Sequence, residues 1–266
     1  MNLHNAAMST DKVHELVSIV IPVFNEQDGI SQLQQRLASL RAAWDKSIDL
    51  EFIFVDDGSA DRTIERLRET FHNEPGVMML AHEHNRGIGA AFRTGFRRCR
   101  GSIVCTIDAD CSYGPENLQR LVAVLKAERA DIAVASPYHP EGMVEGVPRW
   151  RLVLSRSCSV LYGMIAPVRL YTYTSVFRAY RRQVIDSVSF HEDGFVSASE
   201  ILIRAAEAGY RIAEVPMTLH SRKIGQTKMK ILRTIRGHLR LIIATTARRI
   251  QMGFHRPVPP VVSANK

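Results

Sequence analysis

Residues 17–26 read VSIVIPVFNE, an almost unbroken apolar run, rich in β-branched side chains, that ends in two polar residues. Such a run is typical of a strand that is buried on both faces of a parallel sheet. After it, apolar residues from Ile30 to Trp44 recur at helical spacing, and residues 50–55 form a second apolar run. The order strand, helix, strand predicts a β-α-β unit with parallel strands.

The same alternation continues along the chain. Further strands are expected at residues 77–81, 102–107, 131–135, 175–180 and 211–215. Further helices are expected after Asp61, at residues 88–98, after Pro115, at residues 149–165 and at residues 199–208, and a loop is expected at residues 142–148. This series predicts the α/β class, with a Rossmann-like, mostly parallel sheet and helices on both of its faces.

The composition is that of an ordinary globular domain. Hydrophobic residues make up 45% of the 266 residues and charged residues 23%, which indicates neither disorder nor a repeat protein. The net charge of +8 favours anionic partners such as nucleotides, phosphates or an acidic membrane face. No nucleic-acid-binding motif accompanies this charge, so nucleic acid is not an expected partner.

The sequence also bears on the cellular compartment. No segment is apolar for long enough to cross a bilayer, and residues 1–16 lack the apolar core of a signal peptide. The four cysteines form no Cys-x-x-Cys pair, and reduced cysteines suit a cytoplasmic protein. We therefore expect a cytoplasmic protein, with peripheral binding to the cytoplasmic membrane face as an extension of that expectation.

Three predicted strands end in polar or acidic clusters. These are PVFNE (22–26), DDGS (56–59) and DAD (108–110). In open α/β sheets, ligands bind beyond the carboxyl ends of the strands, so these clusters are candidates for one site. Two carboxylates separated by one residue suit a hard divalent cation that also holds a diphosphate. The alternative is that the aspartates form turns and cap helices.

In this fixed order the motifs resemble those of family 2 glycosyltransferases with the GT-A fold. Within that family, segments of the second half are similar to the dolichyl-phosphate mannose synthases and the bacterial polyprenyl-phosphate sugar transferases. The segments are TSVFRAYRR (174–182), GFVSASE (194–200), GYRIAEVP (209–216) and RKIGQTK (222–228). The resemblance implies a hexosyltransferase that requires Mg²⁺ or Mn²⁺, a GDP- or UDP-linked sugar as donor, and a lipid-phosphate acceptor at an anionic membrane surface.

The resemblance also implies roles for individual residues. Those that would contact the nucleotide are Pro22, Phe24, Glu26, Asp56, Asp57, Arg86, Gly87, Asp108 and Ala109. Among them, Asp57 would accept a hydrogen bond from the base. The metal ligands would be Asp110, as the main ligand, with Asp108 and Ser112. Arg222 and Lys228 would neutralise the departing diphosphate, so Asp110 and Arg222 are assigned to catalysis.

The acceptor region departs from the family pattern. Where the phosphate-acceptor enzymes read Gly-Ser-Arg-Tyr, residues 135–138 read ASPY. Pro137 thus replaces the arginine that would hold a lipid phosphate, although Arg151 and Ser155 remain where the family places further phosphate contacts. A different acceptor is therefore an open alternative.

The need for a general base depends on the acceptor. An inverting transfer to a phosphate needs none, whereas a hydroxyl acceptor requires a carboxylate to take its proton. Glu200 matches a glutamate of the family and is the candidate base, while Glu192 and Asp193 are weaker candidates. The alternative for Glu200 is a helix-face pair with Arg204. Two alternatives to lipid-phosphate glycosylation stay open: transfer to a soluble hydroxyl acceptor, and non-catalytic binding of a nucleotide sugar.

The chain is expected to divide into four parts. They are a flexible N-terminus (1–16), a GT-A domain (17–230), a basic amphipathic helix (231–252) and a disordered tail (253–266). Residues 228–249 mix apolar residues with basic ones such as Arg233, Arg236 and Arg240. Such a helix can lie on an anionic bilayer. The alternative is a helix that packs on the core and has a solvated basic face.

Overall fold

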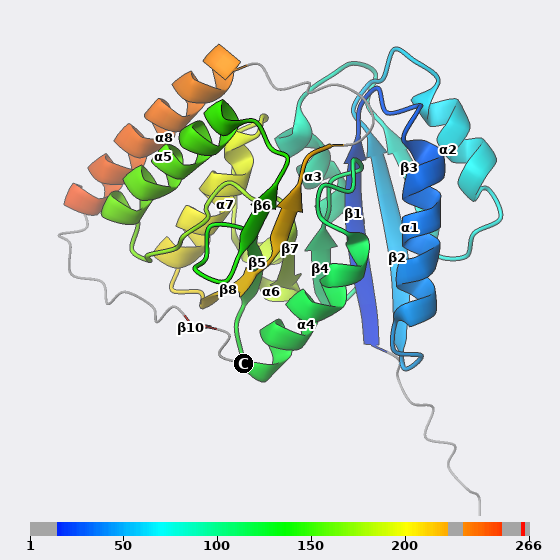
Figure 1. The fold of residues 1–266 in the computed structure, drawn as a ribbon, viewed down its shortest axis with the longest axis horizontal. Coiled ribbons are helices and arrows are strands. Elements are labelled where there is room, and N and C mark those ends of the chain that lie inside the picture. The colour runs from blue at the N-terminus through cyan, green and yellow to red at the C-terminus, as the bar shows by residue number, and fades with distance from the viewer. Residues whose placement is uncertain (1–14, 223–230, 252–261, 264–266) are drawn as a thin grey trace, which may run out of the picture.

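An eight-stranded sheet forms the centre of the computed structural model, which describes residues 15–222, 231–251 and 262–263 (Figure 1). Its strands are β1 (Glu15–Val23), β2 (Ile48–Asp56), β3 (Val77–Ala81), β4 (Ile103–Thr106), β5 (Ile132–Ser136), β7 (Arg178–Arg181), β8 (Ile212–Pro216) and β10 (Val262–Ser263). They lie in the order β10-β8-β5-β7-β4-β1-β2-β3. Only β7 is antiparallel to its neighbours, β4 and β5. The predicted mostly parallel α/β sheet is confirmed.

Helices cover both faces of this sheet. They are α1 (Ile30–Ala43), α2 (Thr63–Phe71), α3 (Ile88–Phe96), α4 (Leu118–Ala127), α5 (Arg149–Ile165), α6 (Arg182–Ser187), α7 (Val196–Glu207) and α8 (Ile231–Gln251), with a 3-10 turn at Pro115–Asn117 before α4. In Figure 1, α1 and α4 lie in front of the sheet, and α3 and α7 lie behind it. The chain therefore forms three layers, as the alternation of strands and helices predicted.

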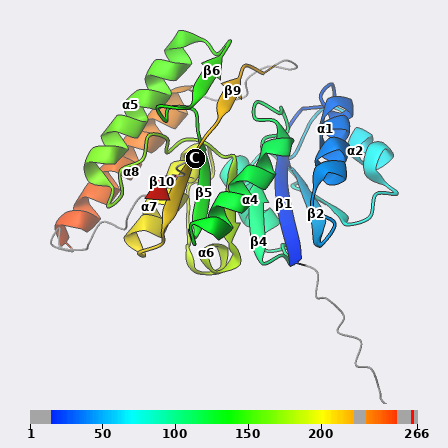
Figure 2. The same cartoon turned by 60° about the horizontal axis from the view of Figure 1, so that its bottom comes forward.

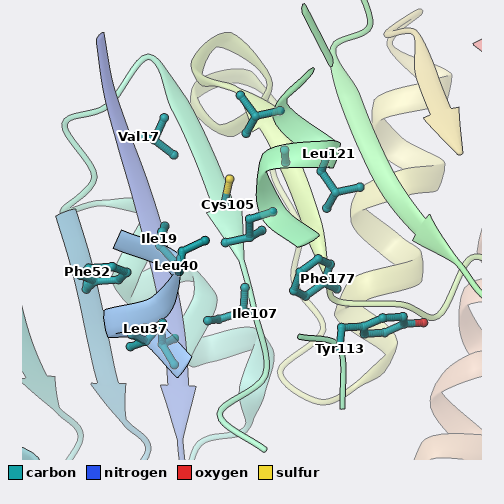
Figure 3. Close-up of a cluster of buried hydrophobic side chains, with 14 of the residues drawn as sticks. Val17, Ile19, Leu37, Leu40, Phe52, Cys105, Ile107, Tyr113, Leu121 and Phe177 are labelled. Atoms are coloured by element: carbon teal, nitrogen blue, oxygen red, sulfur yellow. The ribbon is translucent and has the colours of Figure 1, made fainter. Parts of the chain in front are cut away.

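Successive residues of the central strands feed two apolar cores, one on each face. Ile19 and Phe52 belong to the core under α1 and α4, whereas Val20 and Ile53 belong to the core under α3 and α7. Figure 3 shows the first core, in which Leu37 and Leu40 of α1 lie by Ile19 and Phe52, and Leu121 of α4 lies on the side of Phe177. Burial on both faces explains why these strands are continuous apolar runs rather than alternating ones.

The register of β1 and β2 places the polar strand ends together. The two strands pair in parallel, with Ile19 opposite Phe52 and Val23 opposite Asp56. The segments that follow, 24–26 and 57–59, therefore leave the same edge of the sheet. Strand β4 runs parallel to β1 on its other side, so the 108–110 segment reaches this edge as well.

Two local predictions differ from the structure. The segment 142–148, expected to be a loop, contains strand β6 (Met143–Glu145), which pairs in parallel with β9 (Thr218–His220) in a small second sheet. The strand expected at 175–180 begins at Arg178 and runs antiparallel. Neither feature leaves a clear pattern, because short strands of three or four residue pairs depend on tertiary contacts rather than on periodicity.

Helices α5 and α8 lie side by side at one end of the molecule, far from α1 and α2 (Figures 1 and 2). Their inner faces close the second core with Tyr162 of α5 and Leu241 of α8. In the last turn of α8, the guanidinium of Arg249 donates to the carbonyls of Ile165 and Ala166 at the end of α5. No helix in the described part of the chain combines the length and the apolar character that a membrane crossing requires.

Candidate functional site

A cavity of about 1410 Å³ opens at the edge of the sheet where β1, β2 and β4 end. Most residues predicted for the site line it, namely Pro22, Phe24, Glu26, Asp57, Arg86, Gly87, Asp108, Ala109, Asp110, Ser112 and Arg222. Two predicted residues, Asp56 and Glu200, are absent from its walls. Lys228 lies outside the described residues, so its predicted role stays a prediction.

A compact ionic cluster forms one end of this cavity. Glu26 follows β1, Asp110 follows β4, and Arg222 follows β9, so three distant segments meet here. The Nε atom of Arg222 lies 3.2 Å from Oδ2 of Asp110, and its Nη2 atom donates to Glu26. Burial, together with the charge of Asp110, raises the pKa of Asp108 to about 8, although Arg222 opposes this rise. One guanidinium therefore stands beside three carboxyl groups, an arrangement that favours a further cation.

The donor set fits a hard divalent cation. Asp108 and Asp110 offer carboxylate oxygens, and the backbone N–H of Ser112 donates to Oδ1 of Asp110 at 2.9 Å, which orients that carboxylate. Within the described residues, no group of three or more His, Cys, Asp or Glu side chains is arranged to hold a metal ion by itself. Two carboxylates that leave further positions to substrate phosphates are a common arrangement for Mg²⁺. The residues therefore suit a cation that arrives with a diphosphate.

Asp57 lines the cavity but is already fully engaged with the protein. Its Oδ1 atom accepts from His82 Nδ1 at 2.7 Å and from the N–H of Arg86 at 3.0 Å. Its Oδ2 atom accepts from Asn85 Nδ2 at 2.9 Å and from the N–H of Gly87 at 2.7 Å. A carboxylate has about four acceptor sites. Asp57 thus holds the 82–87 loop in place, and a base could reach its oxygens only by displacing a protein donor.

Asp56 has the turn-forming role that the sequence left as an alternative. Its carboxylate accepts from both the backbone N–H and the hydroxyl of Ser59, and only 3% of the residue is exposed. Burial raises the pKa of Asp56, while the Ser59 hydrogen bonds lower it. Asp56 does not line the cavity, because its carboxylate caps the turn that follows β2. Its contact with the nucleotide stays a prediction.

Two glycines of the 87–89 segment allow a second loop to approach. A Cβ atom on Gly87, where φ is +102°, would stand 2.4 Å from the carbonyl oxygen of Asp193. A Cβ atom on Gly89 would stand 2.2 Å from the carbonyl oxygen of Glu192. The N–H of Gly89 donates to Asp193 O at 2.6 Å. The glycines are thus required by close backbone contact, and Glu192 and Asp193 become part of the cavity wall.

Glu200 is bonded to the protein and does not line the cavity. Its Oε2 atom accepts from the N–H groups of His191 and Glu192 at 2.9 and 2.8 Å, and its Oε1 atom accepts from Arg204 Nε at 2.7 Å. Only 3% of the residue is exposed. The sequence alternative, a pair with Arg204 four residues later, is the observed one. Glu200 therefore fixes the 191–192 loop, while Glu192 and Asp193 of the same loop line the cavity.

A buried arginine supports the floor of the cavity. Arg178 of β7 is fully buried and donates to the carbonyls of Tyr173 at 2.9 Å and Ala198 at 2.6 Å. Thr172, Thr174 and neighbouring residues of the same segment line the cavity. The sequence places Arg178 in a family-like segment but does not predict this role, because a buried arginine cannot be distinguished from a surface one by sequence pattern.

Helices α5 and α8 build the remaining wall. Arg151 and Ser155 of α5 line the cavity, and the Ser155 hydroxyl hydrogen-bonds that of Thr174 at 2.7 Å. Pro137 is buried and lines the cavity at the end of β5. From α8, Arg233, Arg236 and Arg240 also line it. The sequence assigned these three arginines to a membrane surface, although their spacing already placed them on one side of the helix.

The fold and the carboxylate-bearing strand ends together define a transferase of the GT-A class. The sequence profile of the glycosyl transferase family 2 matches residues 18–189, and the chain belongs to this family. The predicted family and fold class are thereby confirmed.

Three relatives are similar to the chain at 31–32% identity. They are a dolichol-phosphate mannosyltransferase of Pyrococcus furiosus (31% identity over 80% of this chain and 59% of the relative), a polyprenol monophosphomannose synthase of Mycolicibacterium smegmatis (31%, 79% and 80%) and an undecaprenyl-phosphate 4-deoxy-4-formamido-L-arabinose transferase of Edwardsiella ictaluri (32%, 86% and 67%). The chain thus spans 59% of the length of the Pyrococcus relative.

Among solved structures, the chain is similar to glucosyl-3-phosphoglycerate synthase from Mycobacterium tuberculosis in complex with Mn²⁺, UDP and glucosyl-3-phosphoglycerate. The TM-score is 0.65 at 22% identity, over 90% of this chain and 81% of the synthase. At that identity the comparison supports the fold alone.

Proposed function

We propose that this protein is an inverting glycosyltransferase that moves a sugar from a nucleoside-diphosphate sugar to a polyprenyl phosphate, with Mg²⁺ or Mn²⁺ as cofactor. The observation that carries the proposal is the cluster of Asp108, Asp110 and Glu26 with Arg222 in a cavity at three strand ends. Relatives named for dolichol phosphate, polyprenol and undecaprenyl phosphate support this class of acceptor.

The transfer we propose is a single in-line displacement. An oxygen of the acceptor phosphate forms a bond to the anomeric carbon, and the bond from that carbon to the diphosphate oxygen breaks, with its electron pair leaving on the nucleoside diphosphate. Arg222, held beside Asp110, is placed to neutralise charge on that leaving group. The bound cation would supply further neutralisation at the same phosphates. A phosphate acceptor arrives ionised, so no protein base is required.

The second candidate function is transfer to a soluble hydroxyl acceptor. It is favoured by Pro137, which stands on the cavity wall where the family pattern has arginine. It would require a base, and Glu192 is the better candidate than Glu200, since it lines the cavity. Burial raises the pKa of Glu192, as does the charge of Glu200, whereas Arg240 lowers it. A raised pKa brings a carboxylate closer to the range in which it can accept and release a proton.

The membrane surface is the site of action that we propose for the lipid acceptor. Helices α5 and α8 carry an apolar ridge of side chains that are between 40% and 76% exposed: Trp150, Val153, Val160, Leu161, Met164, Leu232, Leu239, Ile243 and Ile250. Exposed apolar surface on neighbouring helices is typical of a protein or membrane contact. The net charge of +8 favours an anionic bilayer as the partner.

The proposed function is tested by a screen of nucleotide sugars with and without an acceptor. UDP- and GDP-linked sugars are incubated with Mn²⁺ or Mg²⁺ and a prenyl phosphate, and both the released nucleoside diphosphate and the extractable sugar lipid are measured. We expect one donor to give both products in equal amounts and chelation of the metal to stop the reaction. Binding of a nucleotide sugar with no transfer to any acceptor would identify a non-catalytic relative instead.

A further inference from the structure

Four arginines of the two end helices line the same cavity, and we call them the arginine wall: Arg151 of α5 with Arg233, Arg236 and Arg240 of α8. In α8 the positions 233, 236 and 240 are three and four residues apart, which places their side chains on one side of the helix. Gly237, between them, packs against Val196 of α7, where a Cβ atom would come within 2.8 Å of Val196 Cγ2. This close packing holds the basic side of α8 next to the cavity.

Three of the four arginines of the arginine wall have no carboxylate partner within the described residues, although all four line one cavity. Within the described ranges, Arg151, Arg233 and Arg236 form no ion pair, and the charge of Arg240 acts on Glu192, whose pKa it lowers. By contrast, Arg93, Arg204 and Arg248 are paired with Asp193, Glu200 and Glu207. Cations gathered on one wall repel one another unless an anion joins them. The wall is therefore suited to an anionic ligand that comes from outside the chain.

The ligand of the arginine wall must differ from the donor diphosphate. The diphosphate is assigned to Asp108, Asp110 and Arg222 at the sheet edge, whereas the arginine wall belongs to the helices. Pro137 leaves the end of β5 without the cation that the family pattern has there. A second phosphate in the cavity would therefore find its positive charge on α5 and α8.

We propose that the arginine wall binds the phosphate of the acceptor and so takes over the task of the arginine that Pro137 replaces. This inference rests on the proposed transfer to a phosphate acceptor and specifies how the acceptor is held. Arginine suits the task because its guanidinium offers several N–H donors to phosphate oxygens. The phosphate is thereby brought into the cavity that also contains Arg222 and the metal-binding carboxylates.

The surroundings of the arginine wall determine which phosphate is bound. On α8, the exposed side chains of Leu232, Leu239 and Ile243 form a stripe next to the arginine stripe. On α5, the exposed side chain of Trp150 likewise lies next to an arginine of the wall, since the guanidinium of Arg151 is 5.5 Å from its ring centroid. An acceptor with an ionic head and a long apolar tail fits this order, with its phosphate at the arginines and its tail along the ridge. A small phosphorylated metabolite would leave the ridge uncovered.

The test measures acceptor binding apart from donor binding. The protein with Arg233, Arg236 and Arg240 all changed to Gln is compared with a control of equal charge, in which Arg68, Arg98 and Arg120 are changed to Gln. The control arginines are exposed and do not line the cavity. Calorimetry is run with farnesyl phosphate below its micellar concentration, with farnesol, with inorganic phosphate, with 3-phosphoglycerate, and with UDP or GDP plus Mn²⁺.

We expect the triple variant to bind farnesyl phosphate at least about tenfold more weakly than the wild type and the control, since it loses charge-assisted hydrogen bonds to phosphate. Its affinity for the nucleoside diphosphate with Mn²⁺ should stay within about twofold. A single change, Arg151→Gln, should also weaken the binding of farnesyl phosphate. A thermal unfolding curve checks that each variant is folded.

Three results would overturn the inference. They are unchanged farnesyl phosphate affinity in the triple variant, an equal loss in the control, and tighter wild-type binding of 3-phosphoglycerate than of farnesyl phosphate. If the wild type binds no nucleoside diphosphate with Mn²⁺, the proposed function itself fails. That outcome is distinct, because the donor and the acceptor are measured separately.

Discussion

At the edge of the sheet, three carboxylates that line the cavity are held by protein donors, whereas three arginines of α5 and α8 that line it have no ion pair within the described residues. Asp57 is saturated by four donors, and Asp110 and Glu26 are paired with Arg222. On the helices, Arg151, Arg233 and Arg236 have no ion pair within the described residues. If the proposed function holds, the donor end of the cavity is built before ligand arrives, while the acceptor end is completed by ligand.

The largest effect is expected where the sheet edge is most fully bonded. Asp57→Ala removes the acceptor of His82, Asn85 and two backbone N–H groups, and a buried donor left unsatisfied costs about 1–3 kcal/mol. We expect the free energy of unfolding to fall by about 3–4 kcal/mol in urea titrations. The free energy of unfolding should fall by less in Asp57→Asn, which keeps one acceptor oxygen. A loss below about 1 kcal/mol in Asp57→Ala would mean that the 82–87 loop is held by other contacts.

The second effect concerns the metal-binding end. Asp110→Ala should weaken binding of the nucleoside diphosphate with Mn²⁺ about 100-fold, equivalent to about 2.7 kcal/mol, because the main oxygen ligand is lost. Calorimetry with and without EDTA measures this, and Glu83→Gln, an exposed change away from the cavity, is the control. If chelation and Asp110→Ala both left the affinity unchanged, the assignment of the metal to this end would be wrong.

Much of the sheet edge could be predicted from the sequence, and the reason is the buried parallel strands. Continuous apolar runs such as 17–24 and 50–55 locate the strands, and the residues that follow them must meet at one edge. That reasoning brought Glu26, Asp57, Asp108 and Asp110 to one cavity correctly. It does not reveal hydrogen-bond partners.

The roles of individual carboxylates were harder to predict than their positions. Asp57 was assigned to the base and Glu200 to catalysis, yet both carboxylates are engaged with protein donors. A carboxylate next to a strand end looks the same in sequence whether it faces a ligand or a backbone loop. The 192–193 loop and the basic side of α8 were also not placed in the cavity, because their approach depends on the packing of Gly87, Gly89 and Gly237.

The third prediction separates the two roles proposed for Glu200. Glu200→Gln retains one acceptor for the N–H groups of His191 and Glu192 but loses the ion pair with Arg204. We expect stability to fall by about 1–2 kcal/mol and kcat to change by less than about tenfold. Loss of a general base would instead lower kcat by about 100-fold or more without affecting stability. Steady-state kinetics and thermal unfolding of the same preparation distinguish these results.

The smallest effect is expected at the apolar ridge. Its size tests whether the ridge, rather than the arginines of α8, binds the membrane. The sequence predicts membrane binding by Arg233, Arg236 and Arg240, and in the structure these exposed arginines also line the cavity. Leu239 and Ile243, which are 52% and 68% exposed, do not line it. Changing Leu239 and Ile243 together to Gln should lower co-sedimentation with anionic vesicles about tenfold, or about 1.4 kcal/mol, since two apolar side chains that leave water only in part contribute about that amount together. Met143→Gln, equally exposed but on β6, is the control. High salt should weaken the binding of the protein to anionic vesicles, because salt screens the attraction between its positive charges and the lipid. If the arginine triple variant lost vesicle binding and the ridge variant kept it, the arginines would face the bilayer, and the division between a phosphate-binding side and a lipid-facing side of α8 would be wrong.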